Sequence, residues 1–274
     1  MKPLSSSRNL AATQAPWGLC QYPITPSFEE NWKEVKKLFL SKPPKANFLV
    51  FPEMWLGSPK KKGEKERGEQ ENILECARFY KRILGEVKVW CAKNKKTLFF
   101  SQLEESKNKF YNTAYCINEK GKVAASYRKI HLFSFGGETK LFSAGHKPVT
   151  FKTEVGKMGM VVCYDIRFPE LIRHLTHKGM QILVVGAQWP IERIDHWLTL
   201  LKARAIENQI YVVGVNRLGK KENQVFSGHS VVFDPWGNKL LELDENTFYG
   251  SCILDLKFQE NIRGKYPFLK ERKL

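Results

Sequence analysis

The segment NFLVFPEMW places a carboxylate at the end of a predicted buried strand. Its apolar run ends at Pro52, and Glu53 follows where the strand must stop. Ligands of open α/β sheets bind at the carboxyl edge of the strands, and the apolar neighbours Met54 and Trp55 suit a carboxylate that acts as a general base. A strand-end glutamate can equally cap a backbone group or pair with an arginine, so this segment alone leaves a structural role open.

The segment GMVVCYDIRFPEL resembles a nucleophile elbow in its layout. Cys163 closes an apolar run, and an acidic, aromatic turn leads into a helix expected to begin near Pro169. Backbone N–H groups of such a turn and the positive end of the helix are expected to lower the thiol pKa and to hold an oxyanion. The alternative is a buried structural cysteine, which suits four others: Cys20, Cys76, Cys116 and Cys252.

The segment SYRKIHLFSFGGETKLFSAG carries a lysine and a second carboxylate. Lys129 lies in a strand-like alternation, and Glu138 follows nine residues later, past a Gly136-Gly137 turn. A lysine near a thiolate would stabilise both the thiolate and a tetrahedral oxyanion. Taken alone, this segment also fits a solvated basic strand face, because Arg128 and His131 flank the lysine.

These residues need a scaffold, and the apolar runs indicate one α/β domain. The chain has 274 residues, 42 % of them hydrophobic, and the runs recur almost to the end. We expect a domain over residues 17–256, with an N-terminal tail at 1–16 and a C-terminal tail at 257–274. Strands are predicted at Trp17–Tyr22, Phe48–Phe51, Thr97–Phe100, Ala114–Ile117, Gly159–Cys163, Ile182–Val185, Tyr211–Val215, Val231–Phe233 and Gly250–Leu254.

Helical patterns lie between several of these strands. They are predicted at Phe28–Leu40, where Ser27 and Glu30 resemble a capping box, and at Asn72–Lys93, Glu170–His177 and Ile194–Gln209. Turn residues predict two hairpins, one between Ala114 and Val123 and one between Val231 and Leu241. Antiparallel pairs among alternating strands and helices predict a mixed-sheet sandwich.

The formal net charge of +17 would suit a nucleic-acid binder, but the basic residues are not clustered along the sequence as such a binder requires. Lysines are spread over helix faces and loops, and the densest run, PKKKGEKERGEQE, mixes them with glutamates. We therefore expect the stretch Ser58–Glu71 to be a solvated surface loop and predict no nucleic-acid partner. Attraction of small anions remains compatible with this charge.

The six cysteines include no C-x-x-C pair, which indicates a reducing compartment. The first sixteen residues lack a signal-peptide core, and no segment approaches the length of a membrane span, so we expect a cytoplasmic protein without membrane contact. His174 and His177 are three apart on a predicted helix without acidic or cysteine partners. No metal and no cofactor is predicted.

FPEMW, YRKIHLF and VVCYDIRFPEL, in this order, resemble the three catalytic motifs of the nitrilase or carbon–nitrogen hydrolase superfamily. The similarity continues through GAQWP, ARAIENQIYVVGVNR and FSGHSVVFDPWGN, and covers about Trp17 to Leu254. The amino-acid sequences of CYDIRFPEL and of the ARAIENQ helix are most similar to those of the ω-amidase-like branch. The resemblance implies a four-layer α-β-β-α sandwich, usually dimerised.

The resemblance also implies a Glu-Lys-Cys triad. Glu53 would be the general base, Lys129 the partner of the oxyanion and Cys163 the nucleophile, with Glu138 matching the family's second glutamate. The Tyr164 backbone N–H would share the oxyanion with Lys129. The expected substrate is a small amide of a dicarboxylic acid, such as 2-oxoglutaramate.

Specificity is expected from side chains around this triad. Gln188 stands where many relatives carry Asn or another small polar residue, and Trp55, Tyr164 and Trp189 would narrow the pocket against extended peptides. Arg167 would either meet a substrate carboxylate or form a structural salt bridge.

The same residues also bear on three other functions. A papain-like hydrolase would need His131 or His229 as its base, and neither lies in a convincing signature. An amidohydrolase of N-carbamoyl-β-alanine or another N-carbamoyl amino acid would use the same triad, and it is the nearest rival. A basic binding protein on an inactive scaffold would require the loss of a triad residue, whereas all three are present.

Overall fold

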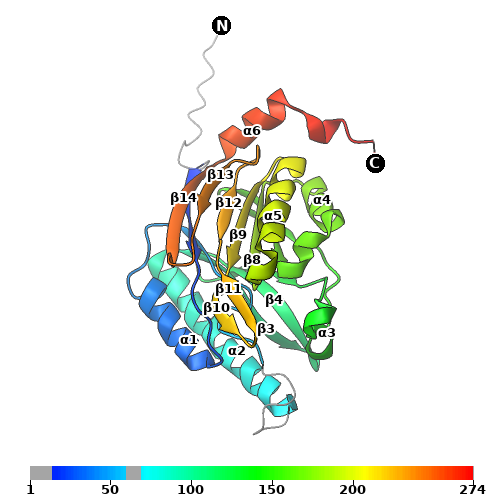
Figure 1. The fold of residues 1–274 in the computed structure, drawn as a ribbon. Helices are drawn as coiled ribbons and strands as arrows, with labels where there is room; N and C mark the ends of the chain where they lie inside the picture. The colour runs from blue at the N-terminus through cyan, green and yellow to red at the C-terminus, as the bar shows by residue number, and fades with distance from the viewer. Residues whose placement is uncertain (1–13, 60–68, 274) are drawn as a thin grey trace.

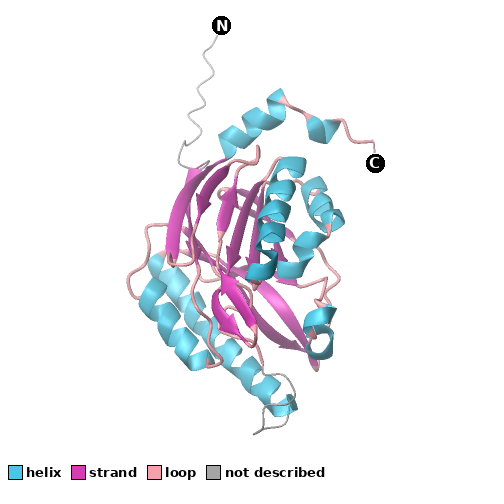
Figure 2. Cartoon of the chain, in the orientation of Figure 1, coloured by secondary structure: helices cyan, strands magenta, loops and turns pink. Residues whose placement is uncertain are grey.

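Two six-stranded mixed sheets pack face to face, and helices cover the outer face of each (Figures 1 and 2). The computed structural model describes residues 14–59 and 69–273. The α-β-β-α sandwich expected from the sequence is therefore confirmed. Of the N-terminal tail expected at 1–16, residues 1–13 lie outside the described residues, as does most of the charged stretch Ser58–Glu71. Residues 14–16 do not belong to a tail, because they are the start of the strand Gln14–Cys20.

The first sheet has the strand order β14-β1-β2-β3-β4-β5. β1, β2 and β3 run parallel, and their neighbours pair antiparallel. Side chains alternate between its faces: Phe48 and Val50 pack toward the second sheet, while Leu49 and Phe51 pack with the helices. Its strands are β1 (Gln14–Cys20), β2 (Phe48–Val50), β3 (Thr97–Ser106), β4 (Lys109–Ile117), β5 (Val123–Arg128) and β14 (Tyr249–Asp255).

Two helices cover the first sheet. α1 (Phe28–Val35) begins at Ser27, whose side chain accepts a hydrogen bond from the Glu30 N–H as the capping pattern predicted, and it continues as a π-helical turn over Lys36–Leu40. α2 (Glu69–Asn94) lies beside it (Figure 1). Their apolar faces form one core with the outward side of the sheet.

The second sheet has the order β13-β12-β9-β8-β7-β6, and α4 (Pro169–His177) and α5 (Ile194–Asn208) cover it. β7, β8 and β9 run parallel, so their carboxyl ends share one edge. The strands are β6 (Thr150–Thr153), β7 (Gly156–Val162), β8 (Ile182–Ala187), β9 (Tyr211–Asn216), β12 (Val231–Phe233) and β13 (Lys239–Glu242).

Both predicted hairpins are confirmed, because β4 pairs antiparallel with β5 and β12 with β13. A third hairpin, β10 (Leu218–Lys221) with β11 (Gln224–Ser227), forms a separate two-stranded sheet. The segment expected to be a C-terminal tail begins with a helix, α6 (Leu256–Lys265). The side chains of Gln259 and Arg263 hold α6 through hydrogen bonds to main-chain carbonyls that include that of Gln209.

The two sheets approach closely where their strands end. A Cβ atom added at Gly186 in β8 would lie 3.1 Å from the Phe51 carbonyl oxygen and 3.2 Å from the Glu53 nitrogen. A glycine at this position therefore allows the chain leaving β2 to lie directly against β8. The carboxyl ends of strands from both sheets consequently meet at one place, and the candidate residues lie there.

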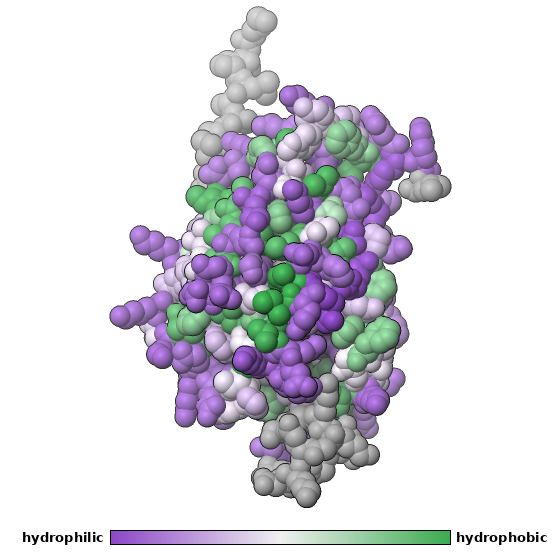
Figure 3. Space-filling model, in the orientation of Figure 1, coloured by the Kyte–Doolittle hydropathy of each residue, from purple (hydrophilic) through white to green (hydrophobic). Residues whose placement is uncertain are grey.

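Hydrophilic residues cover most of the face shown in Figure 3, with smaller hydrophobic groups between them. This surface agrees with the even spread of charged residues along the sequence. All six cysteines are free thiols. Among the described residues, the helices are too short or too polar to cross a membrane.

Candidate functional site

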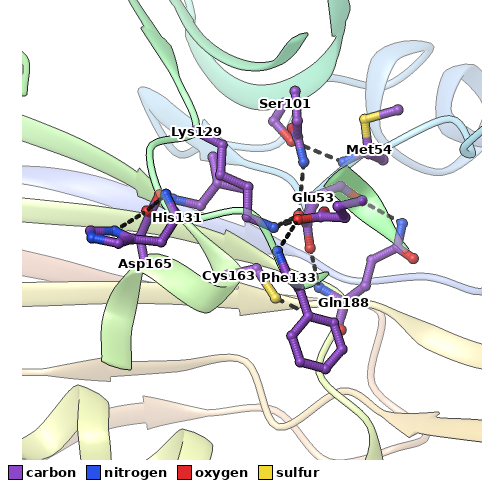
Figure 4. Close-up of polar contacts among 12 residues, drawn as sticks. Glu53, Met54, Ser101, Lys129, His131, Phe133, Cys163, Asp165 and Gln188 are labelled. Atoms are coloured by element: carbon purple, nitrogen blue, oxygen red, sulfur yellow. Dashed lines mark hydrogen bonds and ion pairs between the residues drawn. The ribbon is translucent and has the colours of Figure 1, made fainter. Parts of the chain in front are cut away.

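Glu53 lies just beyond the end of β2 and accepts hydrogen bonds from both sheets (Figure 4). Its Oε1 accepts from Lys129 Nζ and from Asn112 Nδ2, each at 2.8 Å, and its Oε2 accepts from the Gln188 N–H at 3.1 Å. The Gln188 side-chain amide also donates to the Glu53 carbonyl oxygen at 3.0 Å. These contacts hold a buried carboxylate in a single position.

Lys129 lies between two carboxylates. It follows β5, and its backbone N–H donates to the Asn112 carbonyl oxygen at 2.9 Å, which continues the pairing with β4. Its Nζ is 2.8 Å from Glu53 Oε1 and 2.8 Å from Glu138 Oε1, and the side chain is 1 % exposed. Burial by itself would lower the pKa of Lys129, but Glu53 and Glu138 outweigh burial and raise it. The lysine is therefore buried between two carboxylates that favour its charged form, and it is not part of a solvated strand face.

Glu138 is the first residue of the short helix α3 (Glu138–Leu141). The preceding Gly137 has φ +77°, a conformation that favours glycine, so the predicted glycine turn is present. Glu138 Oε2 accepts a hydrogen bond from the Phe133 N–H at 2.7 Å, which leaves Oε1 directed at Lys129. Burial raises the pKa of Glu138, Lys129 opposes that rise, and Glu53 adds to it.

Cys163 follows the last residue of β7 and begins a 3₁₀ turn over Cys163–Arg167. Its φ of 48° lies in the left-handed region, as expected for a sharp strand-to-helix turn. The thiol lies 3.9 Å from the Gln188 carbonyl oxygen, to which it can donate (Figure 4). The expected lowering of the thiol pKa is wrong: burial and Glu53 raise the pKa of Cys163, and Lys129 opposes them only in part.

Asp165 connects the Cys163 turn to the Lys129 segment. This fully buried carboxylate accepts from the Val162 N–H at 3.0 Å, immediately before Cys163. It also accepts from Tyr127 Oη at 2.8 Å and from the backbone N–H of His131 at 2.9 Å, on either side of Lys129, and the His131 ring lies 2.9 Å away. Asp165 therefore fixes the Cys163 segment and the Lys129 segment relative to each other.

A cavity of about 480 Å³ lies over these groups. That volume suits a small molecule. The apolar part of its wall includes Phe133, Phe135, Leu141, Phe142 and Phe226, and the β10–β11 hairpin adds a polar side. The lining contains Glu53, Lys129, Glu138, Cys163, Gln188, Arg193, Lys221, Glu222, Asn223 and Gln224. The structure thus brings together five residues singled out in the sequence, which are Glu53, Lys129, Glu138, Cys163 and Gln188.

Four residues expected around the substrate are placed elsewhere in the described part of the chain. Trp55 is fully buried in the helix-side core, where it stacks on Phe100 with ring centroids 4.5 Å apart, because the chain turns immediately after Glu53. Trp189 packs against Trp197, and the Arg167 guanidinium lies over the Trp189 ring. The Tyr164 ring contacts two phenylalanines, Phe133 and Phe168. None of the four lines the cavity, so their positions give no support to the expected pocket roles.

Two residues of the site, Asn112 and Arg193, were not expected from the sequence. Asn112 is a buried amide inside a strand of otherwise apolar or aromatic inward residues, and that interruption was the available signal. Arg193 ends a 3₁₀ turn over Ile191–Arg193 just before α5, close in sequence to the GAQWP motif. Within the described residues, no group of three or more metal-ligating side chains gathers.

Comparison with known proteins agrees with this geometry. A model of the carbon–nitrogen hydrolase family matches residues 16–257. The chain belongs to this family. The carbon–nitrogen hydrolases of the nitrilase superfamily act on carbon–nitrogen bonds other than peptide bonds, and this chain is such a hydrolase of the ω-amidase-like branch.

Two relatives and one solved structure illustrate the similarity. The chain is 32 % identical over 234 residues to a 2-oxoglutaramate amidase of Paenarthrobacter nicotinovorans, a match that covers 84 % of this chain and 79 % of the relative. It is 41 % identical over 157 residues to a 2-oxoglutaramate amidase of Bacillus subtilis, covering 57 % of this chain and 61 % of that relative. A carbon–nitrogen hydrolase from Helicobacter pylori shares the fold, with a TM-score of 0.86, 23 % identity and coverage of 96 % of both chains.

Proposed function

We propose that this carbon–nitrogen hydrolase cleaves the amide of a short, carboxylate-bearing ω-amide, such as 2-oxoglutaramate, and releases ammonia. The observation that carries the proposal is the meeting of Glu53, Lys129, Glu138 and Cys163 in one small cavity. The two relatives named 2-oxoglutaramate amidase support the particular substrate.

The first half of the reaction forms a thioester. Because the pKa of Cys163 is raised, the thiol needs a base, and Glu53 takes its proton as the sulfur attacks the amide carbon. The new C–S bond turns the carbonyl oxygen into an oxyanion, which Lys129 and the Tyr164 N–H stabilise. Glu53 then returns the proton to the amide nitrogen, the C–N bond breaks and ammonia leaves.

The second half of the reaction hydrolyses the thioester. Glu53 accepts a proton from a water molecule as the water oxygen attacks the thioester carbon. Lys129 again faces the oxyanion, the C–S bond breaks, and the proton returns to the sulfur of Cys163. Glu138 contributes by holding Lys129, since both its carboxylate oxygens are engaged, one with Lys129 Nζ and the other with the Phe133 N–H.

The substrate is tested by measuring kcat/KM for 2-oxoglutaramate and N-carbamoyl-β-alanine under identical conditions, with a nitrile and a short peptide as further substrates. We expect the ω-amide to be preferred over the carbamoyl compound, because two relatives are named 2-oxoglutaramate amidase. It should also be preferred over the nitrile, because Glu53 can protonate a departing amine, and over the peptide, because the cavity suits a small molecule. A clear preference for the carbamoyl compound would contradict the ω-amide assignment and leave the roles of Glu53, Lys129 and Cys163 intact.

A further inference from the structure

The groups at the bottom of the cavity oppose the entry of an anion. Glu53 and Glu138 are two carboxylates that share the single ammonium of Lys129. A substrate carboxylate would therefore meet an excess of negative charge near Cys163. An anionic substrate needs a further cation in the cavity wall to hold its charge away from the two glutamates.

Arg193 supplies such a cation. It lines the cavity, and its side chain makes no ion pair and no hydrogen bond with any residue that the structure describes. Its main chain is nevertheless fixed, because its N–H donates to the Pro190 carbonyl oxygen at 3.1 Å and its carbonyl oxygen accepts from Trp189 Nε1 at 2.7 Å. The backbone that carries this side chain is thus fixed, and the guanidinium itself has no ion pair within the described part of the chain.

We infer that Arg193 binds the carboxylate of the substrate while the amide group reaches Cys163. This inference rests on the proposed function and names the residue that makes the site selective for acidic amides. A guanidinium pairs with a carboxylate through two parallel N–H···O bonds, which fixes orientation as well as charge. A neutral amide of the same length would not bind more tightly because of Arg193, since it has no carboxylate to pair with the guanidinium.

Arg167, the arginine that the sequence offers for this role, provides the matched control. Its guanidinium lies 4.7 Å from the centroid of the Trp189 ring, and its Nη2 is 3.4 Å from His196 Nδ1. It does not line the cavity. The two arginines belong to neighbouring parts of the fold, since each contacts Trp189, but only Arg193 is exposed to the space where a substrate would lie.

The test compares Arg193→Gln with Arg167→Gln on two substrates, 2-oxoglutaramate and the neutral amide pentanamide. We expect Arg193→Gln to raise KM for 2-oxoglutaramate roughly 10- to 100-fold, because a hydrogen bond to a charged group is lost, with a much smaller effect on kcat. The kcat/KM for pentanamide should stay within about twofold of wild type, since this substrate has no carboxylate for Arg193 to bind. Arg167→Gln should leave the ratio of the two kcat/KM values unchanged.

Several outcomes would overturn the inference. Equal losses on both substrates in a folded Arg193→Gln protein would show a structural role, and a changed preference in Arg167→Gln alone would assign carboxylate recognition to the other arginine. If Arg193→Gln fails to fold, Arg193→Lys keeps the charge without the paired geometry, and it should raise KM for 2-oxoglutaramate and spare pentanamide. A wild-type protein that cleaves pentanamide and no carboxylate-bearing amide would refute the proposed function, and the inference with it.

Discussion

Replacing Lys129 with methionine separates the two roles of the buried lysine. The substitution keeps most of the side-chain volume but leaves Glu53 and Glu138 without the ammonium that lies 2.8 Å from each. Removing one partner of a buried ion pair typically costs about 3–5 kcal/mol of unfolding free energy, because the remaining charge is left uncompensated. Loss of one group that stabilises the oxyanion should also lower kcat roughly 100- to 1,000-fold.

The loss of stability in Lys129→Met should depend on pH. In the wild type, burial raises the pKa of Glu138, Lys129 opposes this rise, and Glu53 adds to it. Without Lys129, the folded-state pKa of Glu138 rises further above its unfolded-state pKa. At pH values between these two pKa values, the folded state therefore binds more protons than the unfolded state. Stability then falls as pH rises, and the deficit relative to wild type should be larger at about pH 8 than at about pH 5.

Urea unfolding at both pH values and an ammonia-release assay would measure these effects, with the exposed Lys140→Met as a matched control. The double variant Lys129→Met/Glu138→Gln should recover much of the lost stability, because one of the two carboxylates is gone, and should remain inactive. A Lys129→Met protein as stable as wild type at the higher pH would refute the electrostatic reasoning. Ammonia release within about tenfold of wild type would refute the role at the oxyanion.

Two further variants test the nucleophile and its support. Cys163→Ala should abolish ammonia release, whereas Cys252→Ala should not, and iodoacetamide inactivation with Cys163 unmodified in peptide mapping would contradict this assignment. Asp165→Asn should lower the unfolding free energy by about 1–3 kcal/mol for each donor left without an acceptor, and should reduce kcat. Thermal unfolding measures this effect, with the exposed Asp195→Asn as the control variant. Equal stability of the two variants would argue that Asp165 does not connect the Cys163 and Lys129 segments.

The strands that carry the site were predictable because each combines two independent signals. The first signal is an apolar run that ends abruptly, and the second is an ionisable or nucleophilic residue directly after it. Glu53 after β2 and Cys163 after β7 show both. β2 and β7 belong to different sheets, so their ends meet because the two sheets pack face to face, which the strand pattern alone did not show. The depth at which Lys129 is buried was not predictable, because Arg128 and His131 beside it are partly exposed, and a single strand cannot show which side is covered.

The wall of the cavity could not be predicted in the same way. The β10–β11 hairpin is short and polar, and it acquires its position from tertiary contacts, among them the buried Arg217, which donates to the Ile24 and Leu218 carbonyl oxygens. The helix α6 has few apolar residues, and hydrogen bonds from Gln259 and Arg263 to distant carbonyls hold it. In both segments the pattern of apolar residues is weak, so tertiary contacts decide where the segment lies.

Two of the eight non-glycine residues with positive φ in the described part of the chain lie where the two sheets bring Glu53 and Cys163 together. Cys163 has φ 48° and Met54, next to Glu53, has φ 44°, a conformation that costs a non-glycine residue about 1–2 kcal/mol. Glycine would remove the cost at position 163 but would also remove the thiol. At Met54 the turn lets its N–H donate to Ser101 Oγ at 2.9 Å, which ties the segment around Glu53 to β3. Because rigid strands on both sides enforce these turns, the proposed base and nucleophile are held in place before a substrate arrives, and little reorganisation is left for the proposed reaction.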